Sequence, residues 1–299
     1  MKQIYIQIIL LFFVLTISSE SYSHDKFPIL QGTYMGQTPP GLTPKIFAPG
    51  IVSLAGRYEG AISFSSDLKE VYFGANNKNQ ETAIYFSKLE NNKWIPIKKA
   101  DFTQGKKDEE IHPFVSLDGK RIYFTGLNSD LSDTRIWYVN RLKNSWSKAV
   151  KLGSPINDGQ VFYPVQSASG DLYYFNLLKG KNYIASNSNG DFLAPKEVNI
   201  EFGVHAYISP SQDYLLVNAR NKDDDNRKDN ELYVYFKKQD GTWTKAINLG
   251  GAVNTHSNEK TPTISPDGKY LFFGRDEADG KANIYWVSTK VIENLRPKK

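Results

Sequence analysis

Carboxylate and imidazole side chains recur in this sequence at fixed distances from five similar short motifs. The reference positions in these motifs are Asp67, Asp118, Ser169, Ser211 and Asp267. Eight residues earlier stand Glu59, Glu110 and Glu259, and six residues earlier stand His112, Tyr163 and His205. Such groups transfer protons, and paired carboxylates hydrolyse glycosidic bonds. The spacing therefore raises acid–base chemistry on a glycan as one hypothesis.

A set of eight residues is predicted to surround a polar ligand. Arg220 and Arg275 complete the series, because each follows a predicted strand in its own repeat. The predicted binding residues are Glu59, Glu110, His112, Tyr163, His205, Arg220, Glu259 and Arg275. A structural interpretation stands beside this one: a repeat also preserves side chains that satisfy backbone groups where strands begin. We therefore assign no catalytic residue.

An acidic loop, "NKDDDNRKDNE" at 221–231, is a second place for chemistry. Asp223, Asp225 and Asp229 carry the oxygen ligands that Ca²⁺ prefers. The loop does not fit the EF-hand pattern, which needs Gly at its sixth position and Glu at its twelfth, and neighbouring Lys and Arg offset its charge. A solvated loop is favoured, and no metal or cofactor is predicted.

Other catalytic motifs are missing from the sequence. His112 and His205 do not have a zinc-binding spacing, although a site built across repeats stays open. There is no glycine-rich phosphate loop, no Gly-x-Ser-x-Gly elbow and no cysteine. Hydrolase chemistry of those kinds is not expected.

The elements that position these residues come from a repeated hairpin. "ISPDGKYLFFG", 264–274, places a Ser-Pro-Asp-Gly turn between two strand-like runs. Four earlier stretches match it: "SFSSDLKEVYFGA", "FVSLDGKRIYFTG", "VQSASGDLYYFN" and "YISPSQDYLLVNAR". The reference positions are 51, 51, 42 and 56 residues apart. Five copies of one supersecondary unit are thus predicted.

Each copy is predicted to form four antiparallel strands. The third strand is a segment such as "AIYFS" or "NIYWV", and the fourth opens on an aromatic residue: Trp94, Trp146, Phe192 or Trp243. Pro96 and Pro195 mark the fourth strand as an edge, because proline donates no ladder hydrogen bond. The last copy lacks this strand, and residues 45–53 are expected to supply it. The fold class is all-β, a single five-bladed β-propeller. Six blades remain the alternative, with a degenerate blade within 27–58.

The topology of such a blade places the candidate residues at one end of the ring. In an antiparallel four-stranded blade, the connections into the first strand and after the second lie on the same side. The Ser-Pro-Asp-Gly turns lie on the other. The candidate site is therefore expected where the central channel opens on the first side.

A family resemblance follows from the last repeat. "SNEKTPTISPDGKYLFFGR" and "GKANIYWVSTKVIENLRP" resemble the PD40 family of WD40-like β-propeller repeats, in the TolB-like propeller group of exported bacterial proteins, and "GQTPPGLTPKIFAPGIVS" resembles their N-terminal lead-in. The resemblance covers about residues 31–297. It implies a periplasmic or surface protein that binds proteins or glycans. It does not specify an activity, because propellers host unrelated functions.

The N-terminus predicts export. Lys2 and the apolar run 4–17 are typical of a secretory signal peptide cut before His24, although an uncleaved anchor is the alternative. The expected divisions are 1–23 signal peptide, 24–44 lead-in segment and 45–297 propeller. With no cysteine there is no lipid-attachment site, so a soluble periplasmic or secreted protein without a stable membrane span is predicted.

Composition narrows the classes of partner. The chain has 299 residues, 40% hydrophobic and 23% charged, with a net charge of +5 spread along its length. A nucleic-acid site would need a basic stripe, which is missing. The predicted function is a non-catalytic, monomeric binding or scaffold module for a protein or oligosaccharide partner. The alternative is a glycan hydrolase or lyase that uses the carboxylates. An assembly role through the blade edges is disfavoured, because Pro and Lys blunt those edges.

Overall fold

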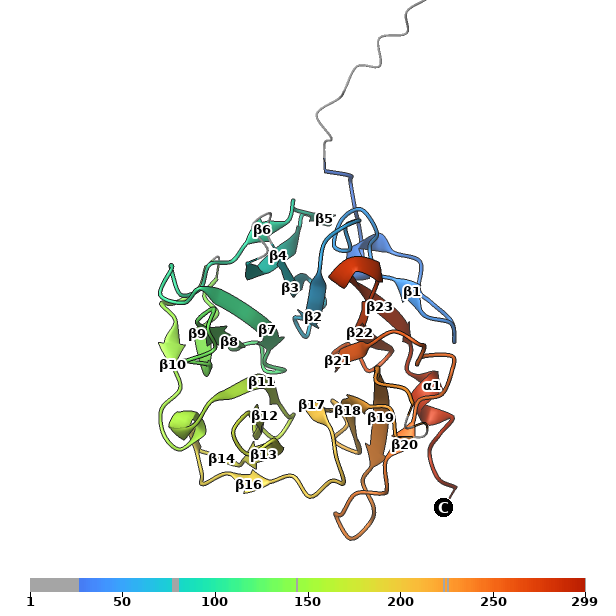
Figure 1. The fold of residues 1–299 in the computed structure, drawn as a ribbon. Helices are drawn as coiled ribbons and strands as arrows, with labels where there is room; N and C mark the ends of the chain where they lie inside the picture. Colours follow the sequence, from blue (N-terminus) through green and yellow to red (C-terminus); the bar gives the residue numbers. More distant parts are fainter. Residues whose placement is uncertain (1–26, 77–80, 144, 223, 225, 299) are drawn as a thin grey trace, which may run out of the picture.

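The computed structural model describes residues 27–76, 81–143, 145–222, 224 and 226–298, which form five antiparallel blades in a ring (Figure 1). The predicted all-β, five-bladed propeller is confirmed. The proposed signal peptide, residues 1–23, lies outside the described residues. Within the described ranges, no helix combines the length and apolarity that crossing a membrane requires.

Each blade has three long strands and a short outer one. The inner strands are β2 (Glu59–Phe64), β7 (Glu109–Val115), β11 (Val161–Gln166), β17 (Val204–Ile208) and β21 (Glu259–Ile264). The second strands are β3 (Glu70–Asn76), β8 (Arg121–Leu127), β12 (Leu172–Asn176), β18 (Tyr214–Arg220) and β22 (Tyr270–Asp276). The third strands are β4 (Thr82–Glu90), β9 (Arg135–Asn140), β13 (Lys181–Ala185), β19 (Asn230–Phe236) and β23 (Ala282–Ser288). The outer strands of blades 1 to 4 are β6 (Lys98–Lys99), β10 (Val150–Lys151), β16 (Lys196–Glu197) and β20 (Ile247–Asn248).

The repeated motif forms the turn between the first two strands of every blade. In blade 5 the Gly268 amide donates to the Ser265 carbonyl at 2.8 Å, and the Ser265 hydroxyl donates to Asp267 at 2.7 Å. The fourth turn residue is left-handed in every blade. It is glycine in three of them, at φ 73° for Gly268, but Leu68 and Gln212 in the other two. The end of the ring that carries these turns is called the turn face.

Ring closure follows the sequence-based expectation. Strand β1 (Lys45–Ile46) pairs antiparallel with β23 and completes blade 5, with Lys45 opposite Trp286. The segment before it adds a second contact. The short 3₁₀ turn η1 (Thr33–Gly36) places Tyr34 against Trp286, and the Tyr34 hydroxyl donates to Asp267 at 2.7 Å. Residues from both ends of the propeller therefore hold the last blade together.

The outer strands begin later than predicted. Trp94, in β5 (Lys93–Trp94), pairs with Leu89 at the end of β4, and the outer strand β6 starts four residues further on. Trp146 and Trp243 make equivalent bridges to Arg141 and Lys237. In blade 3 the corresponding hairpin joins β14 (Asn187–Ser188) to β15 (Asp191–Phe192). The aromatics therefore close a hairpin extension of the third strand, and the outer strand begins after a short connecting segment.

Helical structure is confined to short connections. The remaining elements are η2 (Ile156–Asp158), η3 (Ala278–Gly280) and α1 (Lys290–Glu293). The hydrophobic core lies between blades, where one blade's aromatics pack on its neighbour. Trp146 packs edge-on against Phe86 at 4.8 Å and Phe102 at 5.1 Å between ring centroids. These contacts explain the repeated aromatics as packing residues.

Candidate functional site

Every inner strand carries a bulge near the start, at the end of the channel opposite the turn face. The register shifts between Glu59 and Ile62 in β2 and between Ile111 and Phe114 in β7, with equivalent shifts in β11, β17 and β21. Bulges re-aim side chains and often occur beside functional sites. This end of the ring, where the inner strands begin, is called the channel mouth.

Four bulge residues have left-handed backbones. They are His112, Tyr163, His205 and Thr261, with φ between 51° and 58°. This region is disfavoured for residues with a Cβ, so the surrounding sheet holds the conformation in place. These four residues, which the repeat makes equivalent in sequence, therefore share one backbone conformation. The fifth equivalent residue, Ala61, is outside this region.

An aromatic cluster lies on the inner strands of blades 2 to 4. Ring centroids are 5.2 Å apart for His112 and His205, and 4.6 Å apart for Tyr163 and His205. Two tyrosines join inner strands: Tyr163 of blade 3 donates to the Pro262 carbonyl of blade 5 at 2.7 Å, and Tyr207 of blade 4 donates to the Ile264 carbonyl of the adjacent blade 5 at 2.8 Å. The Tyr163 side chain therefore bridges two inner strands that are not neighbours in the ring.

The two histidines of this cluster are neutral at pH 7. Burial lowers the pKa of His205 from its ordinary 6.5 to about 4, although the hydrogen bond to Asn218 opposes the shift. Burial, and then the neighbouring His205, hold the pKa of His112 well below its usual range. His205 Nδ1 lies 2.7 Å from Asn218 Oδ1. His112 Nδ1 is buried and has no hydrogen-bond partner among the described residues.

The three repeated glutamates tie incoming loops to the inner strands. Glu110 accepts hydrogen bonds from the amides of Phe102 at 3.0 Å and Thr103 at 2.6 Å. Glu59 accepts from the Leu54 amide at 3.2 Å and pairs with Arg57 at 2.5 Å. All of these contacts fasten the chain where it enters a blade.

The third glutamate repeats this arrangement in blade 5. Glu259, fully buried, pairs with Arg275 at 2.8 Å and accepts from the Thr255 amide at 3.2 Å. Burial raises the pKa of both Glu59 and Glu259, while their arginines and backbone donors oppose the shift. These contacts are those of structural ties, and Arg275 belongs to the same tie. Arg220, at the end of β18, is exposed and separate from it.

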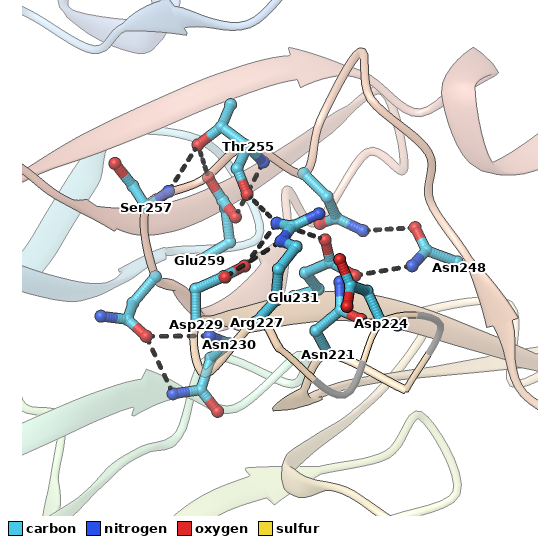
Figure 2. A network of polar contacts seen from close by, with 12 residues as sticks. Asn221, Asp224, Arg227, Asp229, Asn230, Glu231, Asn248, Thr255, Ser257 and Glu259 are labelled. Carbon is cyan, nitrogen blue, oxygen red and sulfur yellow. Dashed lines mark hydrogen bonds and ion pairs between the residues drawn. The ribbon is translucent and has the colours of Figure 1, made fainter.

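The acidic loop is organised by an arginine (Figure 2). Arg227 Nε donates to Asp229 at 3.1 Å, and its Nη2 pairs with Glu231 at 2.8 Å and donates to the Thr255 carbonyl. The guanidinium thus joins blade 4 to the loop that enters blade 5. Asp223 and Asp225, named as calcium candidates, lie outside the described residues. Within the described ranges, no group of three or more His, Asp or Glu could hold a metal.

A cavity of about 340 Å³ opens at the channel mouth beside blade 1. It is lined by Tyr58, Gly60, Ala61, Gly74, Asn76, Thr82, Glu109, Ile111, His112 and Thr261. Two of the buried polar atoms without a hydrogen-bond partner belong to this lining: His112 Nδ1 and Thr261 Oγ1. Buried polar groups are nearly always paired, so two unpaired ones on one cavity wall point to an absent partner. This cavity is the candidate site.

The cavity lies where blade 1 has Ala61 and Gly74, two small residues whose equivalents in blades 2 to 4 are larger, although blade 5 also has a glycine, Gly274, at the second position. Ala61 stands where His112, Tyr163 and His205 stand in blades 2 to 4. Gly74 stands where Thr125 in blade 2 accepts a hydrogen bond from the Tyr163 amide at 3.1 Å. Gly74 is buried, yet a Cβ there would meet nothing within 4 Å. The missing side chains leave the space.

The structure brings some of the predicted site residues together and leaves others apart. Of the eight, only His112 lines the cavity, while Tyr163 and His205 are next to it in the aromatic cluster. Glu59, Glu110, Glu259 and Arg275 are engaged in the loop ties. The residues that sequence reasoning missed are Tyr58, Gly74, Thr82 and Glu109. Only Gly74 carried a signal in the sequence, because with Ala61 it puts small residues where blades 2 to 4 have larger ones.

Solved structures resemble this fold at low sequence identity. A putative TolB from Agrobacterium tumefaciens is 13% identical, with a TM-score of 0.52 over 79% of this chain and 78% of that one. The two proteins share the β-propeller fold. A TolB from Acinetobacter baumannii is 14% identical over 77% of this chain and 54% of that one, with a TM-score of 0.49. A GH62 hydrolase solved with xylotriose is 11% identical over 82% of this chain and 97% of that one, with a TM-score of 0.50.

These likenesses describe the fold alone. No protein-family model and no curated protein matches the chain. Membership of the PD40 repeat family therefore stays a prediction. The propellers that share this architecture include both TolB and a glycoside hydrolase, so the site has to carry the functional argument.

Proposed function

We propose that this protein is an exported, non-catalytic binding module that holds a hydroxyl-bearing ligand, the end of an oligosaccharide, in the cavity at its channel mouth. The observation that carries the proposal is the pair of unpaired buried atoms, His112 Nδ1 and Thr261 Oγ1, on the cavity wall. A sugar hydroxyl both donates and accepts hydrogen bonds, so one ligand could satisfy both atoms.

The rest of the lining suits the same chemistry. Thr82, Asn76 and Glu109 add hydroxyl, amide and carboxylate groups, and Thr82 already donates to Asn76 at 2.9 Å. The glycine and alanine surfaces let a ring approach the backbone closely. The volume falls within the range of small-ligand pockets. Export itself rests on the N-terminal sequence pattern.

Catalysis is not favoured by this arrangement. General acid–base hydrolysis of a glycan needs two carboxyl groups that face one another across the substrate. Glu110 and Glu259 are instead occupied by backbone amides and Arg275, and Glu59 is paired through Oε1, although its Oε2 is buried without a hydrogen-bond partner. A binding role without bond cleavage therefore fits the site better.

A protein partner is the second candidate, and a specific surface favours it. Leu178 and Leu131 are 75% and 55% exposed, on loops that follow the second strands of blades 3 and 2. These loops are on the channel-mouth side of the ring. The two leucines add exposed apolar surface on that side of the ring, which a protein partner could cover. This candidate predicts binding that survives when the cavity is filled.

Calorimetric titration with neutral oligosaccharides tests the first proposal. We expect one of them to bind, to stabilise the protein by about 2.7 kcal/mol at 100 times its dissociation constant, and to remain intact by mass spectrometry. Gly74→Leu should abolish binding, because its side chain enters the cavity, while Gly153→Leu at an exposed, open position should not. Binding that is unchanged in Gly74→Leu would place the site elsewhere, and a shortened sugar would make the protein an enzyme.

A further inference from the structure

Clefts between neighbouring blades open on the turn face, and the one between blades 1 and 2 is internally balanced. It holds a cavity of about 430 Å³. Glu70, at the start of β3, pairs with Arg141 of blade 2 at 2.8 Å and with Lys88 at 3.3 Å. The Tyr72 hydroxyl also donates to Glu70 at 2.8 Å. The Glu70 carboxylate in this cleft is therefore paired with cations from both blades.

The cleft between blades 2 and 3 carries the opposite charge at the equivalent place. Arg121 starts β8 as Glu70 starts β3, and both stand three residues after the reference aspartate of the turn. Its guanidinium lies 4.5 Å from the centre of the Tyr138 ring, and Nη1 donates to the Tyr123 hydroxyl at 3.3 Å. Its partner on the neighbouring strand is the uncharged Asn140, whereas the partner of Glu70 is Lys88.

No carboxylate of the described residues lies within ion-pair distance of Arg121. Asp118, on the same turn, attracts it from further away but is held by Ser116 at 2.7 Å and by the Lys120 amide at 3.0 Å. Asp171 on the adjoining turn accepts from the Asn187 amide at 2.9 Å and from Ser169 at 3.1 Å. The guanidinium is thus half-buried against aromatic rings without a bonded anion.

The space beside Arg121 is a cavity of about 410 Å³ with polar walls. Gln166 faces it and donates to the Gly170 carbonyl at 3.0 Å and to the Tyr123 hydroxyl at 3.4 Å. Lys120, Ser169 and Asn187 also line it. A planar guanidinium supported by a ring, with further donors around it, matches a carboxylate.

We propose that the cleft between blades 2 and 3 on the turn face is a second binding site, which takes a small ligand through its carboxylate. The ligand's carboxylate completes at Arg121 the charge pair that Glu70 and Arg141 complete within the chain one blade earlier. The site is on the opposite end of the ring from the channel mouth. A test of this site is therefore independent of the test of the channel-mouth cavity.

Titration of the full chain with two carboxylate probes and their neutral counterparts tests this site. The probes are glucuronate and N-acetylglutamate, and the controls are glucose and N-acetylglutamine. We expect at least one probe to bind and both neutral compounds to fail, and the better probe identifies a sugar or an amino-acid source. Arg121→Gln should weaken binding at least tenfold. Binding of neither probe, or equal binding of a neutral control, would overturn the proposal.

A second variant keeps the test valid if Arg121→Gln is poorly folded. Gln166→Glu introduces a carboxylate on a side chain that already shares the Tyr123 hydroxyl with Arg121. The new carboxylate at position 166 should pair with the Arg121 guanidinium and abolish probe binding. The melting temperature of the variant should be equal to that of the wild type or higher. The matched control, Gln166→Met, should retain binding within threefold. Unchanged probe affinity in Gln166→Glu would overturn the assignment to Arg121.

Discussion

The two ends of this propeller use equivalent positions in opposite ways. On the turn face, Ser65, Ser116, Ser167, Ser209 and Ser265 occupy one place in five blades, and each accepts a backbone hydrogen bond that closes the turn. At the channel mouth, one place is occupied by Ala61, His112, Tyr163, His205 and Thr261. Identical residues at one end maintain the fold, and different residues at the other make the blades chemically distinct.

The channel mouth also contains a structural layer of its own. Glu59, Glu110 and Glu259 repeat because each fastens an entering loop to an inner strand. The cavity lies next to this layer, where blade 1 has Ala61 in place of the larger His112, Tyr163 and His205 of blades 2 to 4. Repetition therefore marks structural residues at both ends, and exceptions to the repeat mark the candidate site.

The largest expected effect breaks a buried tie at the channel mouth. Arg275→Met leaves the fully buried carboxylate of Glu259 without its ion pair, which typically costs about 3–5 kcal/mol. Urea denaturation measures the loss. The control is Lys181→Met, which removes an exposed pair with Glu197 and should cost at most about 1 kcal/mol. Equal losses in the two variants would show that Glu259 is not a structural tie.

A smaller effect is expected from strain on the turn face. Gly268 has φ 73°, and a Cβ at this position would meet nothing within 4 Å, so Gly268→Ala should lose about 1–2 kcal/mol from backbone strain alone. Gly251→Ala, equally open but without a left-handed backbone, should change the free energy of unfolding by less than about 0.5 kcal/mol. A loss in both variants would indicate that packing, and not the turn conformation, sets the cost.

The aromatic cluster at the channel mouth predicts a pH effect. His205 binds its proton near pH 6.5 when unfolded but only near pH 4 when folded, because burial disfavours the imidazolium. The unfolded state therefore binds more protons in this window, and stability contributed by neutral His205 is lost as the pH falls from about 6.5 toward 4. His205→Gln should make the melting temperature less dependent on pH over this range. A variant with the same pH slope as the wild type would contradict the buried, neutral assignment.

The smallest effect on stability is expected from filling the candidate cavity. Gly74→Leu should change the free energy of unfolding by less than about 1 kcal/mol, because its Cβ meets no neighbour within 4 Å. Chemical denaturation of Gly74→Leu and Gly153→Leu measures this directly. A loss of several kcal/mol would mean that the space beside Gly74 is not open in solution.

Sequence reasoning reaches the fold because the turn chemistry is local. Ser265, Asp267 and Gly268 encode their turn within four residues, and five copies at similar spacing predict the ring and its closure by residues 45–53. The residue pattern places the outer strands too early, because Trp94 and its equivalents look like strand residues. Their pairing with the preceding strand depends on the hairpin geometry, which the pattern does not specify.

The candidate site is only partly predictable. The bulge position is identified through His112 and His205, because their distance from the turn repeats. The cavity escapes sequence reasoning because it is defined by absent side chains at Ala61 and Gly74, whose importance depends on neighbours from other blades. Arg227, which organises the acidic loop, is recognisable in the sequence only as a compensating charge.

The most direct test of the central claim is nitrogen-detected NMR of the histidine side chains during titration with a bound oligosaccharide, with His112→Gln used to assign the signal. Our account predicts that His112 Nδ1, unpaired in the free protein, shifts on binding as it gains a hydrogen bond, while the signals of His256 do not change. An oligosaccharide that binds by calorimetry without moving the His112 signal would contradict the assignment of the channel-mouth cavity as the binding site.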